Sequence, residues 1–189
     1  MNKNIAIFAS GRGSNAKNII EYFKNKDVDI KIIITDNKNA GVLEYAEEYK
    51  IPFLILTENE LRAPELLIKK LQEFNIDLIV LAGYLKLIPV EILDAFKNKI
   101  INIHPALLPK YGGKGMYGMK VHKEVKKAGE QYTGITIHYV NEKYDEGEII
   151  FQKEIKITTD DSPEDIADKV HSLEYKYYPV VIESLLNNS

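Results

Sequence analysis

Short β-branched runs alternate with segments of helical spacing over residues 4–103, and this alternation constrains the fold more than any other feature of the chain. The runs have few polar interruptions, as expected of strands that are buried on both faces. Strands are predicted at residues 4–9, 30–35, 52–56, 77–81 and 99–103. Helices are predicted between them at residues 14–25, 40–50 and 58–75. The sequence therefore predicts an α/β fold with a mostly parallel central sheet and helices on both faces.

The pattern changes in the second half of the chain. Residues 110–117 are rich in Gly and Lys and lack periodicity, so we expect a mobile surface loop there. Residues 133–140 alternate apolar and polar side chains, and residues 148–157 follow a turn at residues 145–147. These two runs predict an antiparallel strand pair that is added to the parallel sheet.

A single domain accounts for the whole pattern. Ser162, followed by a Pro and two acids, is typical of a helix start, and this last helix should extend to about residue 186. No linker, repeat or low-complexity tract divides residues 1–189, and this length is sufficient for one sizeable core.

Composition excludes several functional classes. The net charge of -3 argues against a nucleic-acid binder, which usually has a strong basic excess. The absence of Cys excludes disulfides, thiolate metal sites and Cys nucleophiles. The N-terminal apolar run is too short to span a membrane and has no cleavage-site pattern, so we expect a cytoplasmic protein without a membrane partner.

Residues 101–105, Ile-Asn-Ile-His-Pro, carry the strongest functional signal. Alternate residues of a strand face the same side, so Asn102 and His104 should point together while Ile101 and Ile103 enter the core. Pro105 favours an extended His104 and ends the strand. Ligands bind at this edge of open α/β sheets, and an amide beside an imidazole suits a reaction in which negative charge develops on a carbonyl oxygen. A strand end without chemistry is the alternative.

The glycine turn at residues 10–15, Ser-Gly-Arg-Gly-Ser-Asn, joins the first predicted strand to the first helix. The amides of Gly13, Ser14 and Asn15 would open that helix, where a phosphate is favoured. Two alternatives stay open: Ser14 could simply cap the helix, and Asp36 could hold the ribose of a nicotinamide dinucleotide. The polar Asn15 favours a small phosphate ester, because dinucleotide binders need close helix–strand packing at that position.

Asp145 lies in the turn between the two predicted antiparallel strands, where a solvated carboxylate is common. The functional alternative is that Asp145 reaches back to His104. It would then raise the pKa of the imidazole and keep it protonated near neutral pH. In that state His104 would donate to an oxyanion, with Asn102 as the second donor.

The other three histidines are ambiguous in the sequence. His138 is expected to be a wall or packing residue, and His122 is compatible with an ordinary helix position. His171 and Glu174 are one helical turn apart and could face either solvent or ligand. The histidines and acids form no metal motif such as His-Glu-x-x-His, so no metal is predicted.

Four motifs in this order resemble the phosphoribosylglycinamide formyltransferase family of folate-dependent enzymes. They are Ser-Gly-Arg-Gly-Ser-Asn at 10–15, Leu-Ala-Gly-Tyr at 81–84, Asn-Ile-His-Pro-Ala-Leu-Leu-Pro at 102–109 and Tyr-Asp-Glu-Gly at 144–147. The early glycine turn favours this family over methionyl-tRNA formyltransferase, which also has an extra C-terminal domain. Formyltetrahydrofolate deformylase normally has an additional N-terminal regulatory domain.

The resemblance implies a role for individual residues. The catalytic residues of the family match Asn102, His104 and Asp145. The residues that hold the ribonucleotide and its phosphate match Gly13, Ser14, Asn15, His171, Ser172, Leu173 and Glu174. The folate site matches Arg62, Leu85, Lys86, Leu87, Ile88, Asn102, Asn141, Glu142, Lys143, Tyr144 and Asp145. The chain departs from the family at Glu146, where a Gly is usual, and in the loop after Pro109.

The resemblance also implies a fold and a reaction. The fold would be Rossmann-like, with a phosphate-binding half at residues 1–100 and a folate-binding, catalytic half at residues 101–189. The reaction would move a formyl group from the co-substrate 10-formyltetrahydrofolate to the amine of glycinamide ribonucleotide. Partners would be these small molecules, and the protein would be a monomer or a weak homodimer. A formyltetrahydrofolate hydrolase and a non-catalytic nucleotide-binding module are the two alternatives.

Overall fold

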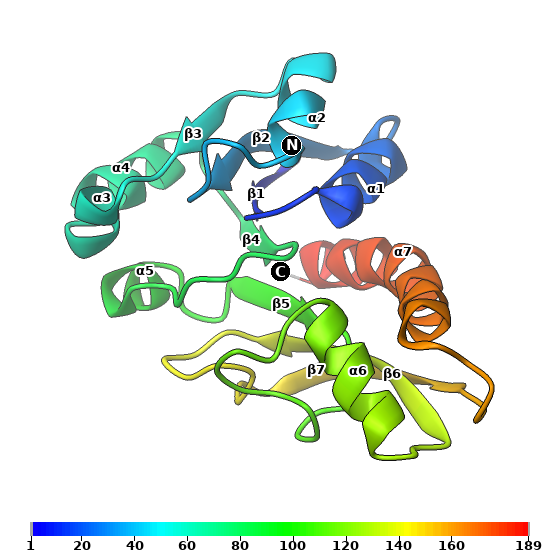
Figure 1. The fold of residues 1–189 in the computed structure, drawn as a ribbon. Coiled ribbons are helices and arrows are strands. Elements are labelled where there is room, and N and C mark those ends of the chain that lie inside the picture. Colours follow the sequence, from blue (N-terminus) through cyan, green and yellow to red (C-terminus); the bar gives the residue numbers. More distant parts are fainter. Residues whose placement is uncertain (1, 189) are drawn as a thin grey trace.

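A seven-stranded sheet forms the centre of the computed structural model, which describes residues 2–188. The strand order is β3-β2-β1-β4-β5-β6-β7 (Figure 1). The strands are β1 (Lys3–Phe8), β2 (Val28–Thr35), β3 (Phe53–Ile55), β4 (Leu78–Leu81), β5 (Ile100–His104), β6 (Tyr132–Tyr139) and β7 (Ile149–Lys156). Strands β1 to β5 pair in parallel, whereas β6 pairs antiparallel with β5 and β7. The predicted fold class is confirmed.

Helices cover both faces of the sheet (Figure 1). They are α1 (Ser14–Phe23), α2 (Val42–Glu48), α3 (Glu58–Arg62), α4 (Glu65–Glu73), α5 (Val90–Ala95), α6 (Met119–Lys127) and α7 (Pro163–Asn187). The single helix predicted at residues 58–75 is wrong, because the chain breaks at Ala63 and Pro64. A Pro has no N–H to continue the helix and moves the preceding residue out of the helical conformation. The helices α5 and α6 were not predicted.

Adjacent residues of a buried strand pack against different helix layers. In β1, Ile5 and Ile7 enter the core that contains residues of α1, α2, α6 and α7. Ala6 and Phe8 enter the other core, which contains residues of α4 and α5. Burying an aliphatic side chain of this size contributes about 1.5–3 kcal/mol, so the two cores fix the strands from both sides.

The long C-terminal helix α7 is tied to the middle of the sheet. A capping box formed by Ser162 and Asp165 begins the helix. Further along, the fully buried Tyr178 hydroxyl donates to the Leu81 carbonyl oxygen at 2.9 Å and lies 3.4 Å from the carbonyl oxygen of Ile101. These contacts fix α7 against the end of β4 and the start of β5. Within residues 2–188, no helix combines the length and apolar character needed to cross a membrane.

Candidate active site

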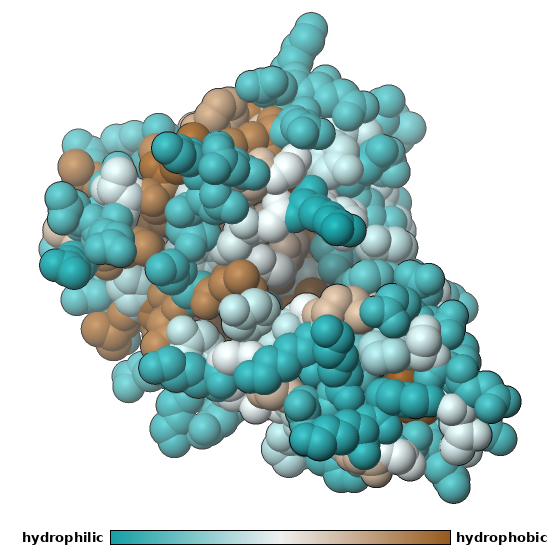
Figure 2. Space-filling model, viewed as in Figure 1, coloured by the Kyte–Doolittle hydropathy of each residue, from teal (hydrophilic) through white to brown (hydrophobic). Residues whose placement is uncertain are grey.

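A cavity of about 540 Å³ opens where β4 and β5 end. Its walls come from the glycine turn, from the segments that follow these two strands, from the loop before α6, from the β6–β7 turn and from α6 and α7. In Figure 2, less polar residues lie in the hollow at the middle of this face and hydrophilic residues surround it. This is the edge of an open α/β sheet at which ligands usually bind.

The carboxyl end of β5 brings Asn102 and His104 to the cavity, as the strand periodicity predicts. Ile101 and Ile103 enter the core on the other side. The Asn102 Nδ2 atom lies 3.2 Å from Nε2 of His138, which is its cross-strand partner on β6. His104 Nε2 lies 2.8 Å from the Tyr111 carbonyl oxygen, so this nitrogen carries a proton and donates.

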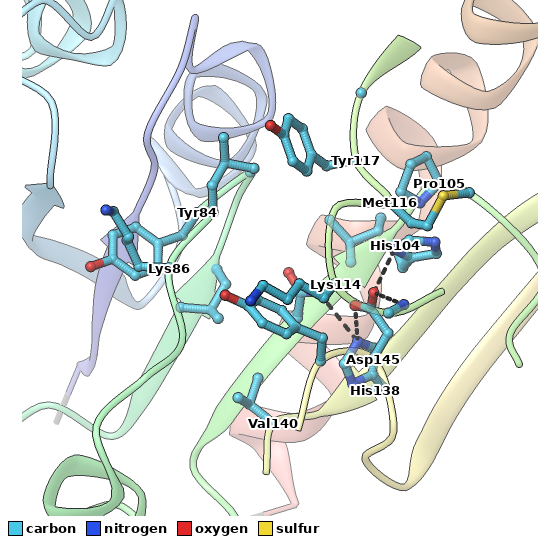
Figure 3. Close-up of a pocket in the computed structure, with 18 of the residues that line it drawn as sticks. Tyr84, Lys86, His104, Pro105, Lys114, Met116, Tyr117, His138, Val140 and Asp145 are labelled. Atoms are coloured by element: carbon cyan, nitrogen blue, oxygen red, sulfur yellow. Dashed lines mark hydrogen bonds and ion pairs between the residues drawn. The ribbon is translucent and has the colours of Figure 1, made fainter. Parts of the chain in front are cut away.

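Asp145 lies between two imidazoles, as Figure 3 shows. Its Oδ2 atom is 3.4 Å from Nδ1 of His104, and its Oδ1 atom is 3.6 Å from Nε2 of His138. The Gly113 amide donates to Asp145 Oδ2 at 2.9 Å, which joins the loop before α6 to the same carboxylate. The β6–β7 turn therefore folds over the end of β5, and the functional alternative for Asp145 has the geometry it requires.

The backbone of this turn is strained in a way that aims Asp145. Asp145 has a φ of 57°, a left-handed conformation that is uncommon for residues other than Gly. A Cβ atom at Gly147 would overlap the Tyr139 carbonyl oxygen, so only Gly fits there. Strained backbone of this kind often occurs at functional sites, where the surrounding structure maintains it.

The charge state of His104 differs from the expectation. Burial lowers the pKa of His104, and the opposing effects of Asp145 and the Tyr111 carbonyl are smaller. The expectation that Asp145 keeps His104 protonated is therefore wrong for the free site, because the cost of desolvating a buried imidazolium exceeds the attraction. Burial would raise the pKa of Asp145, but the contacts with His138, His104 and the Gly113 amide together lower it. At pH 7 these two pKa shifts favour an ionised Asp145 beside a neutral His104.

The other end of the cavity is formed by helices. Asn15 on α1 donates through Nδ2 to the Glu174 carboxylate on α7 at 2.9 Å, and both residues line the cavity. Burial raises the pKa of Glu174, and Asn15 and His171 partly oppose this effect. His171 also lines the cavity and stacks on Tyr175, with ring centroids 6.1 Å apart. This arrangement presents a carboxyl group, an amide and an imidazole to a polar ligand.

The predicted ribonucleotide-binding residues divide into two groups. Asn15, His171 and Glu174 line the cavity, and Gly11 joins them from the same turn. Four residues of the predicted set lie outside the cavity lining, and they are Gly13, Ser14, Ser172 and Leu173. Of these, Gly13 and Ser14 lie where α1 begins. The Ser14 hydroxyl does not cap α1: the N-cap residue is Gly13, and it makes no side-chain cap hydrogen bond. The amides of this helix start are therefore not occupied by a capping side chain.

The predicted folate-binding residues also divide. Those that line the cavity are Leu85, Lys86, Leu87, Ile88, Asn102, Lys143, Tyr144 and Asp145. Asn141 and Glu142 lie outside the lining, although the Asn141 side chain accepts a hydrogen bond from the Lys143 amide. Arg62 lies on α3 with 80% of its side chain exposed, 3.9 Å from Glu58, and it does not line the cavity.

The structure adds residues that the sequence interpretation missed. His138 is buried between Asn102 and Asp145, and the signal that could have identified it is its register opposite Asn102. His122 and Tyr84 line the cavity as well. The loop before α6 contributes residues 113–118 to the cavity lining. Its Tyr111 carbonyl contacts His104, and its Gly113 amide contacts Asp145. Among residues 2–188, no cluster of three or more His, Asp or Glu side chains could hold a metal ion.

Comparison with known proteins agrees with this geometry. Residues 3–182 match the family described as formyl transferase. The phosphoribosylglycinamide formyltransferase of Bacillus subtilis is 40% identical over 97% of this chain and 95% of its own length. The chloroplastic phosphoribosylglycinamide formyltransferase of Arabidopsis thaliana is 43% identical, and the chain spans 65% of its length. The chain spans 61% of the length of the Vigna unguiculata relative.

Solved structures are similar over nearly the whole chain. The crystal structure of phosphoribosylglycinamide formyltransferase from Bacillus halodurans has a TM-score of 0.86 and 36% identity, with coverage of 97% of this chain and 95% of that one. The structure from Anaplasma phagocytophilum has a TM-score of 0.88 and 30% identity, with coverage of 99% and 88%. These similarities extend across both ends of the cavity.

Proposed function

The chain belongs to the formyl transferase family, and we propose that it moves a formyl group from 10-formyltetrahydrofolate to the amine of N1-(5-phospho-D-ribosyl)glycinamide. The products are formylglycinamide ribonucleotide and tetrahydrofolate, a step of de novo purine biosynthesis. One observation carries the proposal. Two hydrogen-bond donors, Asn102 and His104, line a cavity in which an ionised Asp145 lies beside the imidazole.

The reaction needs no protein nucleophile. The ribonucleotide amine attacks the formyl carbon, and the bond from that carbon to N10 of the folate breaks. Negative charge builds on the formyl oxygen, where the Asn102 amide and the His104 Nε2–H donate hydrogen bonds. The Tyr111 carbonyl now accepts the His104 Nε2–H, so the formyl oxygen must replace it. The ionised Asp145 accepts the amine proton through water, and N10 of the leaving folate takes up a proton.

A neutral His104 in the free site is compatible with this role. Because the pKa of His104 is lowered, its imidazole does not readily bind a second proton before the reaction begins. As charge develops on the formyl oxygen, a proton on His104 becomes more favourable: the proton that Asp145 takes from the amine passes to His104 Nδ1, and the Asp145 carboxylate then stabilises the imidazolium. The hydrogen bond from His104 to the formyl oxygen is then stronger in the transition state than in the ground state, which is the condition for acceleration.

Each substrate has a distinct part of the cavity. We assign the ribonucleotide to Asn15, His171 and Glu174, with its phosphate toward the start of α1. We assign the folate to residues 85–88 and 143–145. Holding both substrates in register supplies much of the acceleration, since intramolecular analogues correspond to about 7–11 kcal/mol. On this assignment both halves of the single domain serve both substrates: residues 85–88 of the folate set lie within residues 1–100, and His171 and Glu174 of the ribonucleotide set lie within residues 101–189.

The wider setting is part of the same proposal. The partners are the two small-molecule substrates, without nucleic acid or membrane. We propose a cytoplasmic protein that is a monomer or a weak homodimer. Gel filtration at two concentrations separates these two oligomeric states from a stable higher oligomer.

A transfer assay tests the function. The purified protein is mixed with glycinamide ribonucleotide and 10-formyl-5,8-dideazafolate, and absorbance follows loss of the formyl group. The expected result is turnover that requires the ribonucleotide. Release of formate without the ribonucleotide would identify a hydrolase instead. Binding of NAD with no turnover would identify a nucleotide-binding module.

A further inference from the structure

His122 is a buried imidazole that the proposed mechanism does not use. Only 2% of the residue is exposed, and it lies on α6 between the buried residues Val121 and Val125. Its Nδ1 atom is buried and has no hydrogen-bond partner within residues 2–188. Buried polar groups in native proteins are nearly always paired, so an unpaired one that lines a ligand cavity calls for a partner.

The position of His122 is between the two ends of the cavity. Its ring centroid is 6.3 Å from that of His171, which belongs to the ribonucleotide end. It is also close enough to His104, at the formyl end, for that imidazole to act on it electrostatically. Burial first, and then His171 and His104, lower the pKa of His122 to about 4, so the ring is neutral near pH 7.

A neutral imidazole offers one N–H donor and one lone-pair acceptor. The group of matching chemistry is a secondary amide, which also has one N–H and one carbonyl oxygen. In the proposed acceptor substrate, a secondary amide joins the ribose to the carbon that bears the attacking amine. With the ribose at Asn15 and Glu174 and the amine at His104, this amide spans the part of the cavity where His122 lies.

We propose that His122 binds the secondary amide of the ribonucleotide and so selects an acceptor in which an amide links the ribose to the amine. The inference rests on the proposed function and adds a specificity-determining residue to it. His122 would act in binding, because the amide does not change its charge during formyl transfer. The contact should therefore affect the KM for the ribonucleotide more than kcat.

Three variants test the proposal. His122→Leu removes both hydrogen-bonding atoms at similar size, His122→Asn retains a donor and an acceptor, and Lys123→Leu is the control on the exposed face of α6. For His122→Leu we expect the KM for the ribonucleotide to rise about tenfold and kcat to stay within about threefold. His122→Asn should recover most of the loss, and Lys123→Leu should match the original protein. Unchanged KM in His122→Leu would overturn the proposal.

A substrate analogue tests the contact without depending on how the variants fold. Methylation of the amide nitrogen removes its N–H, and we expect the original protein to use this analogue at least about tenfold less efficiently in kcat/KM. His122→Leu should discriminate much less between the two acceptors. Equal use of both acceptors by the original protein would exclude the amide contact. An original protein that transfers no formyl group to either acceptor would instead refute the proposed function.

Discussion

The two ends of the cavity differ in how their polar groups are connected. At the formyl end, Asn102, His104, His138 and Asp145 come from two adjacent strands and the following turn, and each has a polar partner in the group. At the ribonucleotide end, the side chains come from three helices, and the hydrogen bond between Asn15 and Glu174 is the only one among the cavity-lining side chains described there.

This difference indicates where each end obtains its binding energy. At the formyl end the side chains hold one another in position before the transition state forms, and only the His104 Nε2–H must exchange the Tyr111 carbonyl for the formyl oxygen. The ribonucleotide end leaves Asn15 Oδ1 and His122 Nδ1 buried without partners in the described chain, and a substrate can supply them. We therefore expect changes at the formyl end to alter kcat and changes at the ribonucleotide end to alter KM.

His104→Ala gives the largest expected effect. The variant loses the imidazole that donates a hydrogen bond to the oxyanion and carries a proton during the reaction, so kcat should fall by about 10³-fold. Binding of 10-formyl-5,8-dideazafolate and the KM for the ribonucleotide should change by less than about threefold. Steady-state kinetics and fluorescence titration measure these quantities, with the exposed Lys127→Ala as a control. Turnover equal to that of the original protein would remove His104 from the mechanism and break the contrast between the two ends.

Asp145→Asn should lower kcat by about 10²-fold, because it removes the proton acceptor and the charge that stabilises the imidazolium. The same contact predicts the direction in which the pKa of His104 should move in this variant. The Asp145 carboxylate raises the pKa of His104, although burial makes the net shift downward. Removing that charge should move the titration of His104 to still lower pH. NMR of the His104 ring against pH measures the shift, and an upward move would contradict the electrostatic account.

The parallel part of the sheet could be predicted from the sequence because β1, β4 and β5 are largely buried on both faces and form apolar runs. The short helices could not. The helix α5 has six residues, and α6 follows a glycine, Gly118, that provides no side-chain cap. Helices of this length obtain their stability from tertiary packing, so the local pattern is weak. The break between α3 and α4 could have been predicted from Pro64.

The same reasoning explains which site residues the sequence could predict. Asn102 and His104 alternate on one strand, so local periodicity is sufficient to bring them to one side. The role of His138 depends on its register opposite Asn102, which tertiary structure sets. Asn15 and Glu174 are 159 positions apart in the sequence, and no local pattern connects them. The net pKa of His104 requires the extent of its burial, which a motif does not contain.

Glu174→Gln sharpens the contrast from the ribonucleotide end. The amide replaces a carboxyl group that pairs with Asn15, and we expect the KM for the ribonucleotide to rise about tenfold while kcat changes less than about threefold. Burial raises the pKa of Glu174, so in the original protein binding should weaken as pH falls and the carboxylate gains a proton. The Gln variant cannot gain this proton, and this pH dependence should be absent. A loss confined to kcat would reverse the assignment of the two ends.

Tyr178→Phe tests whether the two ends are mechanically independent, and its expected effect is the smallest. The hydroxyl joins α7, which carries Glu174, to β4 through the Leu81 carbonyl and to β5, which carries Asn102 and His104, through the Ile101 carbonyl. Losing one buried hydrogen bond should cost about 1 kcal/mol of unfolding free energy and lower Tm by roughly 2–4 °C. Differential scanning calorimetry measures this loss. If the ends act separately, kcat and KM both stay within about threefold. A fall in kcat of more than about tenfold would instead mean that α7 positions Asn102 through Ile101, the residue before it on β5.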